Sequence, residues 1–334
     1  MIQYNDPSIP GVIREYLVYI ETIKGKSAAT ADGYYRDLRT FFRFLKHHYH
    51  LVDETIPIDE IDISDVDLEL IKHVTLADAY EFSVYCKNSR NNNDKTRARK
   101  TSTIKSFFKY LTTRAKYLQQ NPLEEFDSPK TKKSLPKYLT LEQSTRLLAA
   151  IDGNYKERNY AIITLFLNCG LRLSELCSLN VNDIDFYERK VRVTGKGNKE
   201  RLVYLNDACI AAIEAYLAVR PNDKAKDRKA LFISRTGNRI SRRMVEQMIY
   251  NVLEKSGLSG MGFSVHKLRH TAATLMHQYG KVDIRVLQEI LGHENLGTTE
   301  IYTHLSGEQI RQASEANPLA NIKNHDFAHI RRKT

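Results

Sequence analysis

Four separate places in the second half of the chain carry residue types that bind phosphate, transfer protons or act as nucleophiles. They are residues 170–176 with Arg172, a glycine turn with Lys196, residues 266–270 with His266 and Arg269, and Leu291-Gly292-His293, which precedes Tyr302 by nine residues. Arginine binds phosphate through its planar fork, histidine and lysine transfer protons, and a tyrosine hydroxyl can attack phosphorus. Each place alone is common in proteins. Their conjunction, in this order and at these separations, is specific.

These segments resemble the tyrosine recombinase (integrase) family, and within it the Xer-like members. The similarity covers nearly the whole chain and is strongest over residues 170–179, 264–275 and 291–305. All six catalytic positions of the family are filled, and by similarity they are Arg172, Lys196, His266, Arg269, His293 and Tyr302. The resemblance implies a site-specific recombinase that cleaves and rejoins double-stranded DNA through a 3′-phosphotyrosyl intermediate. Such an enzyme exchanges strands between two sites via a Holliday junction, for resolution, integration or excision.

Three of the six residues would act on the phosphate itself. Attack on a phosphodiester passes through a pentacoordinate phosphorus whose non-bridging oxygens gain charge, so the site needs fixed cations. Arg172 and Arg269 would supply them, because guanidinium groups stay protonated and match two phosphate oxygens. By the resemblance, His293 adds a further hydrogen bond to the same phosphate.

The other three would form the covalent bond and move the protons. A free tyrosine has a pKa of about 10, so Tyr302 is a weak nucleophile until cations and a base favour its ionisation. His266 would accept the phenol proton, and Lys196 on its glycine-flanked turn would protonate the leaving 5′ oxygen. Because the bond energy is kept in the phosphotyrosyl ester, we expect no cofactor, neither ATP nor a metal ion.

Glu175 lies one helical turn after Arg172. It either holds Arg172 in position from behind or forms an ordinary i, i+3 pair on the surface of a helix. The sequence leaves both interpretations open.

The elements of the first part of the chain are predicted to be helices. Ser27 is a candidate N-cap, and residues 75–78 resemble a capping box with Asp78 in place of glutamate. The apolar residues that recur at helical spacing are Ile13, Tyr16, Leu17 and Ile20, then Tyr34, Leu38, Phe41, Phe42, Leu45 and Tyr49, and then Ile104, Phe107, Phe108 and Leu111. We therefore expect an all-helical bundle.

Positive charge is concentrated between residues 87 and 116 of this bundle. Against the single acid Asp94 stand Arg90, Lys95, Arg97, Arg99, Lys100, Lys105, Lys109 and Arg114. Solvated helices usually mix both signs, so this region favours contact with DNA phosphates over a plain surface role. The proline-bounded segment that follows adds Lys132 and Lys133 as candidate DNA contacts.

The pattern changes after that basic segment and predicts a second domain. We expect a helical, SAM-like core-binding domain over residues 1–127, a basic linker over 128–139 and a catalytic domain over 140–316. Residues 140–143 predict a capping box, and residues 183–187, 190–194 and 201–205 alternate as short strands. The predicted fold class is mainly α with a small β-sheet, in the two-domain tyrosine recombinase fold of a helical domain plus an α+β catalytic domain.

The last segment, residues 317–334, is predicted to be a tail donated to a neighbouring subunit. Its apolar residues, too few for a core of their own, are Pro318, Leu319, Ile322, Phe327 and Ile330. In the family this part of the chain docks on the next protomer, which implies a cyclic tetramer on two DNA sites. The tetramer could contain one chain or a second, related recombinase. The alternative is a helix folded back on its own domain.

Composition favours a cytoplasmic DNA-binding protein. The chain has 51 Lys and Arg against 40 Asp and Glu, a net charge of +11 that favours a polyanionic partner. It offers no long apolar run, and its first residues lack the pattern of a secretion signal, so we expect neither a membrane nor export. The four cysteines show no paired spacing and predict buried thiols in a reducing compartment. We expect no small-molecule substrate.

Two other functions fit part of the sequence. A type IB topoisomerase shares the tyrosine, the arginines and the lysine, but length and the spacing to Tyr302 favour a recombinase. A non-catalytic DNA-binding regulator would use the basic helices alone, and would leave Tyr302 and its five supporting residues unexplained. Among recombinases, chromosome dimer resolution, integration of a mobile element and inversion all agree with the sequence.

Overall fold

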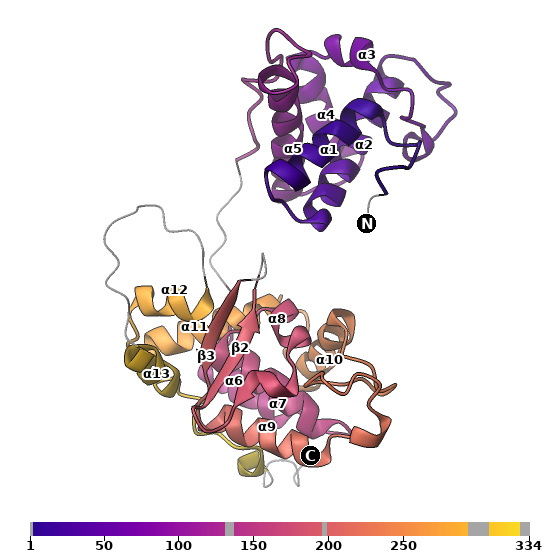
Figure 1. Cartoon of the computed structure of the whole chain (residues 1–334). Helices are drawn as coiled ribbons and strands as arrows, with labels where there is room; N and C mark the ends of the chain where they lie inside the picture. The colour runs from indigo at the N-terminus through magenta and orange to yellow at the C-terminus, as the bar shows by residue number, and fades with distance from the viewer. Residues whose placement is uncertain (1–2, 131–136, 196–198, 293–306, 328–334) are drawn as a thin grey trace. The chain divides into compact units, whose positions relative to one another are not determined.

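Helices dominate both units into which the chain divides, Met1–Ser134 and Leu135–Thr334 (Figure 1). The computed structural model describes residues 3–130, 137–195, 199–292 and 307–327. In this part of the chain one three-stranded sheet, in the second unit, accompanies the helices. The predicted fold class, mainly α with a small sheet, is confirmed.

The first unit is a helical bundle around an aromatic core. Its elements are α1 (Gly11–Val18), the π-helical turn η1 (Tyr19–Ile23), α2 (Ala28–His48), the 3-10 turn η2 (Ile58–Glu60), α3 (Leu68–Lys72), α4 (Leu76–Asn88) and α5 (Asp94–Thr113). Phe41 and Phe42 of α2 meet Phe108 and Phe107 of α5 edge to face, with ring centroids 6.4 and 6.0 Å apart. All four rings are buried, so the predicted apolar stripes do face one core.

The predicted helix starts are confirmed in this unit and the next. Ser27 caps α2 by accepting a hydrogen bond from the Thr30 amide. Thr75 and Asp78 form the capping box of α4, and Thr140 and Gln143 form that of α6. Each box satisfies amides that a helix start leaves without intrahelical partners.

The second unit is built around one buried helix. Its elements are α6 (Leu141–Ala149), α7 (Lys156–Cys169), α8 (Leu173–Ser178), η3 (Val181–Asp183), β1 (Ile184–Asp185), β2 (Lys190–Thr194), β3 (Glu200–Tyr204), α9 (Asp207–Val219), η5 (Asn222–Lys224), α10 (Arg242–Lys255), α11 (Val265–Gln278), α12 (Ile284–Leu291), α13 (Gly307–Glu315) and η6 (Asn324–Phe327). The side chains of α7 are buried from Tyr160 to Cys169, and α9 and α11 pack against it (Figure 1). A helix that is buried on every side belongs in such a centre.

The sheet is antiparallel in the order β1-β2-β3, with Val191 opposite Val203 and Val193 opposite Arg201. β2 has the predicted bounds, and β3 begins and ends one residue earlier than predicted. The first predicted strand, 183–187, is reduced to two residues. Asp183 is held in a 3-10 turn by accepting from the Asn180 amide, and Tyr187 is exposed in the following turn.

Residues 317–322, the start of the predicted tail, pack on their own unit in the structure. Leu319 is fully buried in its main core, the Asn317 amide group donates to the Leu167 carbonyl, and the Ala208 amide donates to Ala320. Donation of the tail to a neighbour stays a prediction only for the last residues. Of these, 328–334 lie outside the described part of the chain.

All four cysteines are free and buried, as predicted. Burial raises the pKa of the Cys86 and Cys177 thiols to about 11, which keeps them protonated. Among the described residues, no helix is both long and apolar enough to cross a membrane.

Candidate active site

A glycine at the end of α7 allows three helices to meet at the site. Gly170 adopts φ +59°, the left-handed conformation that glycine tolerates best. A Cβ added there would lie 2.7 Å from Leu291 Cδ2 of α12 and 3.8 Å from Arg269 Cγ of α11. The chain then reaches Arg172, the N-cap residue of α8, within two residues. The end of α7 thus brings Arg172 and Arg269 together although 97 positions separate them.

Glu175 of α8 lies behind the arginines and is fully buried. Its carboxylate accepts hydrogen bonds from the Arg172 amide and from Arg172 Nη1, both at 2.8 Å. Arg201 of β3 donates to both carboxylate oxygens, at 2.6 and 3.0 Å, and Arg269 Nη1 lies 4.0 Å away. Because Glu175 is buried, the interpretation as a surface pair is wrong.

The charge state of Glu175 follows from these contacts. Burial alone would raise the pKa of its carboxyl, but hydrogen bonds and positive charge from Arg201 and Arg172 outweigh burial and lower the pKa to about 2. The group therefore carries a negative charge at neutral pH. One carboxylate here faces three guanidinium groups, which leaves the cluster with a net charge of about +2 and suits it to an anion.

Arg269 lies on α11, with its side chain only 11% exposed. Its Nη1 donates to the Gly170 carbonyl at 2.5 Å and its Nη2 to the Leu291 carbonyl. Burial, together with the charge of Arg172, lowers the pKa of Arg269 to about 10. The guanidinium still keeps its proton at neutral pH.

The last carbonyls of α12 receive all three arginines. Arg201 Nε donates to Ile290 at 3.4 Å, Arg269 to Leu291, and Arg172 Nη2 to Gly292 at 2.6 Å. Cations at a helix C-terminus complement its partial negative charge and its unsatisfied carbonyls. The next residue in the chain is His293, so the three arginines bind the carbonyls of the residues that directly precede it.

His266 lies in the first turn of α11 and is exposed, three residues before the buried Arg269. Its neighbour His270 has a lowered pKa, because burial and then the charges of Lys267 and Arg269 disfavour protonation.

The other three predicted catalytic residues, Lys196, His293 and Tyr302, lie outside the described residues. Their chain neighbours are described. Gly195 donates from its amide to the Lys199 carbonyl at 2.8 Å, so the residues on either side of 196–198 are hydrogen-bonded to each other. Gly292 ends α12 with φ +61°.

Sequence reasoning missed Arg201, although the sequence carries a signal for it. Arg201 and the buried Val203 lie on the same face of β3, because side chains alternate along a strand. An arginine on a core-facing side needs a buried acid. Glu175 is that acid.

The predicted DNA-contacting residues of the first unit differ in their surroundings. Arg90 pairs with Asp59 and Arg97 with Asp94, each over less than 3 Å. Lys95 is exposed. Lys132 and Lys133 lie outside the described residues.

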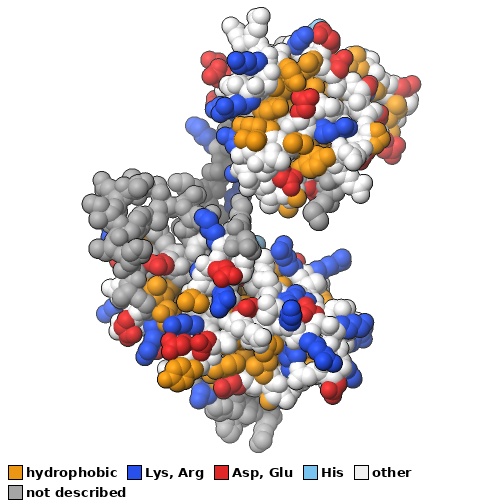
Figure 2. Space-filling model, in the orientation of Figure 1, with side chains coloured by type: hydrophobic (Ala, Val, Ile, Leu, Met, Phe, Trp, Pro, Cys, Tyr) orange, Lys and Arg blue, Asp and Glu red, His pale blue; other side chains and the backbone are white. Residues whose placement is uncertain are grey.

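Lys100 and Lys105 have structural contacts instead. Lys100 is buried and pairs with the buried Asp37 at 3.3 Å, beside Arg99, which pairs with the same carboxylate. Lys105 donates to the carbonyls of Glu124 and Phe126. Lys100 therefore stabilises the bundle, and the prediction that it contacts DNA is corrected because its side chain is buried. Figure 2 shows acidic side chains among the basic ones on the visible face of each unit.

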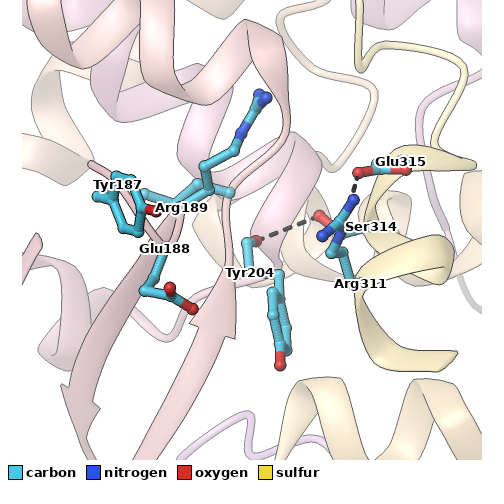
Figure 3. Close-up of a pocket in the computed structure, with 8 residues that line it drawn as sticks. Tyr187, Glu188, Arg189, Tyr204, Arg311, Ser314 and Glu315 are labelled. Carbon is cyan, nitrogen blue, oxygen red and sulfur yellow. Dashed lines mark hydrogen bonds and ion pairs between the residues drawn. The ribbon is translucent and has the colours of Figure 1, made fainter. Parts of the chain in front are cut away.

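A hollow of about 250 Å³ lies between the β1–β2 turn and α13 (Figure 3). Ser314 Oγ donates to the Tyr204 carbonyl across it at 3.2 Å, and Arg311 pairs with Glu315 at 3.3 Å. The residues that line it are Tyr187, Glu188, Arg189, Tyr204, Leu205, Arg311, Ser314 and Glu315. The arginines that surround Glu175 do not line it, so this hollow is distinct from the candidate active site. Over the described ranges, no group of three or more His, Cys, Asp or Glu could hold a metal ion.

Comparison with protein families finds two matches. Residues 137–309 match the phage integrase family, and residues 13–115 match the phage integrase N-terminal SAM-like domain. The tyrosine recombinase XerC of Caldanaerobacter subterraneus subsp. tengcongensis is 51% identical, over 93% of this chain and 88% of that protein. The tyrosine recombinase XerC of Thermodesulfovibrio yellowstonii is 34% identical, over 92% of this chain and 96% of that protein.

Solved structures share the fold. The Tn1549 transposon integrase, in complex with a circular intermediate DNA, has a TM-score of 0.63 and 22% identity. The match covers 86% of this chain and 93% of the integrase chain. The XerH site-specific recombinase bound to a palindromic difH substrate has a TM-score of 0.63 and 21% identity. The match covers 87% of this chain and 81% of the XerH chain.

Proposed function

Because the chain belongs to the phage integrase family as a Xer-like site-specific tyrosine recombinase, we propose that Tyr302 is its nucleophile and that Arg172 and Arg269 bind the scissile phosphate. Enzymes of this family cleave and rejoin DNA through a phosphotyrosine intermediate. The relatives do not favour the topoisomerase or the regulator as alternatives. The observation that carries the proposal is the convergence of three guanidinium groups on one buried carboxylate.

This arrangement supports stabilisation of the transition state. Arg172 and Arg269 are fixed by Glu175 and by backbone carbonyls before any substrate arrives, so little reorganisation is needed when charge develops on the phosphate oxygens. The side chain of Arg172 is 34% exposed, whereas that of Glu175 is 0% exposed. The cation is therefore presented outward while its counter-charge stays inside.

The remaining steps are assigned to the side chains that the resemblance implies. His266, exposed at the start of α11, would take the proton of Tyr302 as the phenolate oxygen attacks phosphorus. The 3′ phosphate becomes linked to Tyr302, and the 5′ oxygen leaves with a proton from Lys196. His293 would hydrogen-bond the same phosphate. Rejoining reverses these transfers with a 5′ hydroxyl from the second site, through a Holliday junction.

The first unit is proposed to contact the DNA backbone through its exposed cations. Lys95 and Lys109 are exposed on α5, and Arg90, Arg97 and Arg99 could exchange their present acidic partners for phosphates. Lys100 is left out because it is buried. Strand exchange between two sites needs four cleavages, so we propose a tetramer, of this chain alone or with a related recombinase, with the last residues of the tail as a contact between subunits.

The phosphate-binding role is tested by single-turnover cleavage of a nicked duplex. Removing one such donor typically slows the chemical step about 10²–10³-fold. We expect Arg172→Gln and Arg269→Gln to lose cleavage by at least that factor while gel-shift affinity changes little. Arg220→Gln is the matched control, because Arg220 is buried and binds the Leu231 and Ala230 carbonyls instead. Wild-type cleavage by Arg172→Gln would overturn the assignment.

A second measurement tests strand exchange. The wild-type protein should convert a DNA carrying two sites into exchanged products, whereas relaxation of supercoils without exchange would return the topoisomerase as the better description. Deletion of 328–334 should weaken cooperative binding to a full site more than binding to a half site. Earlier truncation, at Asn317, would also remove the buried Leu319 and is the wrong variant for this purpose.

A further inference from the structure

Arg201 contacts two separate parts of the candidate site from the strand that follows the Lys196 turn. Its Nη1 and Nη2 donate to the two oxygens of Glu175, and its Nε donates to the Ile290 carbonyl. The site residues predicted from the sequence do not include it. Its side chain is 18% exposed, and it lies two residues after Lys199, whose carbonyl accepts a hydrogen bond from the Gly195 amide.

The stem of Arg201 also supports the end of α12. A Cβ added at Gly292 would lie 3.2 Å from both Cδ and Nε of Arg201 and 3.3 Å from its Cζ. The last residue before His293 therefore rests directly on the Arg201 side chain. At the same time, a Cβ added at Gly195 would lie 3.5 Å from Glu175 Oε1 and 3.9 Å from Arg201 Nη1. Gly195 and Gly292, which precede Lys196 and His293 in the chain, thus both border the ion pair of Arg201 and Glu175.

The carboxylate of Glu175 is shared between Arg201 and Arg172. Oε1 accepts from Arg201 Nη1 and Arg172 Nη1, and Oε2 accepts from Arg201 Nη2 and the Arg172 amide. Loss of Arg201 would leave both oxygens with the Arg172 donors alone and free the Glu175 side chain to shift. Because the same carboxylate holds the phosphate-binding Arg172, loss of Arg201 should reach Arg172 through Glu175.

We propose that Arg201 is a positioning residue of the recombinase: it ties the strand after the Lys196 turn to Glu175 and to the end of α12. This rests on the proposed function, since Gly195 and Gly292, which border the ion pair, directly precede the proposed catalytic residues Lys196 and His293 in the chain. Lysine cannot replace it. An ammonium group lacks the planar fork that binds two carboxylate oxygens while Nε binds a carbonyl.

The test compares Arg201→Lys and Arg201→Gln with wild type, with Arg220→Gln as the structural control. Each protein is given two nicked duplexes, one with a 5′ oxygen leaving group and one with a 5′ sulfur leaving group, which departs without protonation. Single-turnover cleavage, gel-shift affinity and thermal unfolding are measured for each. Partners that orient catalytic groups typically contribute about 10–100-fold. We expect both Arg201 variants to cut the oxygen substrate slower by about that factor, with affinity within about threefold of wild type.

The sulfur substrate separates positioning from general stability. If Arg201 positions the Lys196 turn, its variants should lose less on sulfur than on oxygen, whereas Arg220→Gln should keep the wild-type ratio. Arg201→Lys cutting oxygen at the wild-type rate, or losing equally on both substrates, would overturn the proposal. Lys196→Ala reports separately on the proposed function: if sulfur does not rescue it, Lys196 is not the acid. In that case the role of Arg201 is tested by combining Arg201→Gln with Glu175→Gln. If Arg201 acts through Glu175, the double variant should cleave little more slowly than Glu175→Gln alone. Additive losses in cleavage rate would overturn the proposal.

Discussion

Replacing Gly170 by alanine tests the packing that brings the arginines together. Gly170 has φ +59°, a left-handed conformation that destabilises an L-residue by about 1–2 kcal/mol. The added Cβ would also lie 2.7 Å from Leu291 Cδ2, where α12 meets the end of α7. Such overpacking destabilises by about 1–3 kcal/mol. We therefore expect Gly170→Ala to lower the free energy of unfolding of the second unit by about 2–5 kcal/mol.

Gly153→Ala is the matched control for backbone strain. Gly153 has φ +81° in the connection before α7, and a Cβ added there meets nothing within 4 Å. Only the strain of about 1–2 kcal/mol remains. In a unit of this size each kcal/mol lowers Tm by about 2–4 °C. Gly170→Ala should thus unfold about 2–12 °C below the control.

The assay is scanning calorimetry of the full chain, followed by cleavage of a nicked duplex. The transition of the second unit should move while that of the first stays in place. Cleavage should slow as well, since Gly170 and Leu291 both supply carbonyls to Arg269. Equal Tm shifts for the two variants would show that Leu291 does not crowd this glycine.

Three further predictions concern charge and proton transfer. DNA affinity should fall log-linearly with salt, by about 10³-fold between about 50 and 200 mM if six phosphates are neutralised, and a Lys95→Glu, Lys109→Glu variant should flatten that slope in a filter-binding titration; an unchanged slope would place the DNA elsewhere. The pKa of Glu175 is lowered to about 2 from an ordinary value near 4.5, so its contribution to stability is present above about pH 4.5 and is lost as pH falls toward 2. Urea midpoints of wild type and Glu175→Gln should therefore converge over that range, and divergence would contradict the sign. Lys196→Ala should recover cleavage on a duplex with a 5′ thiol leaving group, and an unchanged sulfur-to-oxygen ratio would remove Lys196 as the acid.

Much of the fold followed from local sequence patterns. The stripes of α1 and α2 and the capping boxes at Thr75 and Thr140 depend on residues three or four positions apart, and the structure has them as predicted. The predicted strand over 183–187 is longer than β1. The turn at Asp183 is set by a side-chain hydrogen bond, which the alternation of apolar and polar residues does not indicate.

The network around Glu175 could not be predicted from spacing alone. Arg172 and Glu175 are neighbours on one helix turn, but Arg201 and Arg269 reach the carboxylate from β3 and α11 through tertiary packing. The same limit applies to Lys100, whose burial depends on Asp37 in another helix. A run of positive charge in the sequence does not distinguish an exposed cation from one that neutralises a buried acid.

Mass spectrometry of the trapped adduct identifies the residue that becomes covalently linked to DNA. The protein is incubated with a nicked duplex whose short 5′ fragment diffuses away after cleavage, denatured and digested, and the DNA-linked peptide is sequenced. We expect a nucleotide attached to Tyr302 in the wild-type protein, and no adduct for Tyr302→Phe at undiminished DNA affinity. An adduct on another tyrosine, or one that survives denaturation in Tyr302→Phe, would contradict this expectation.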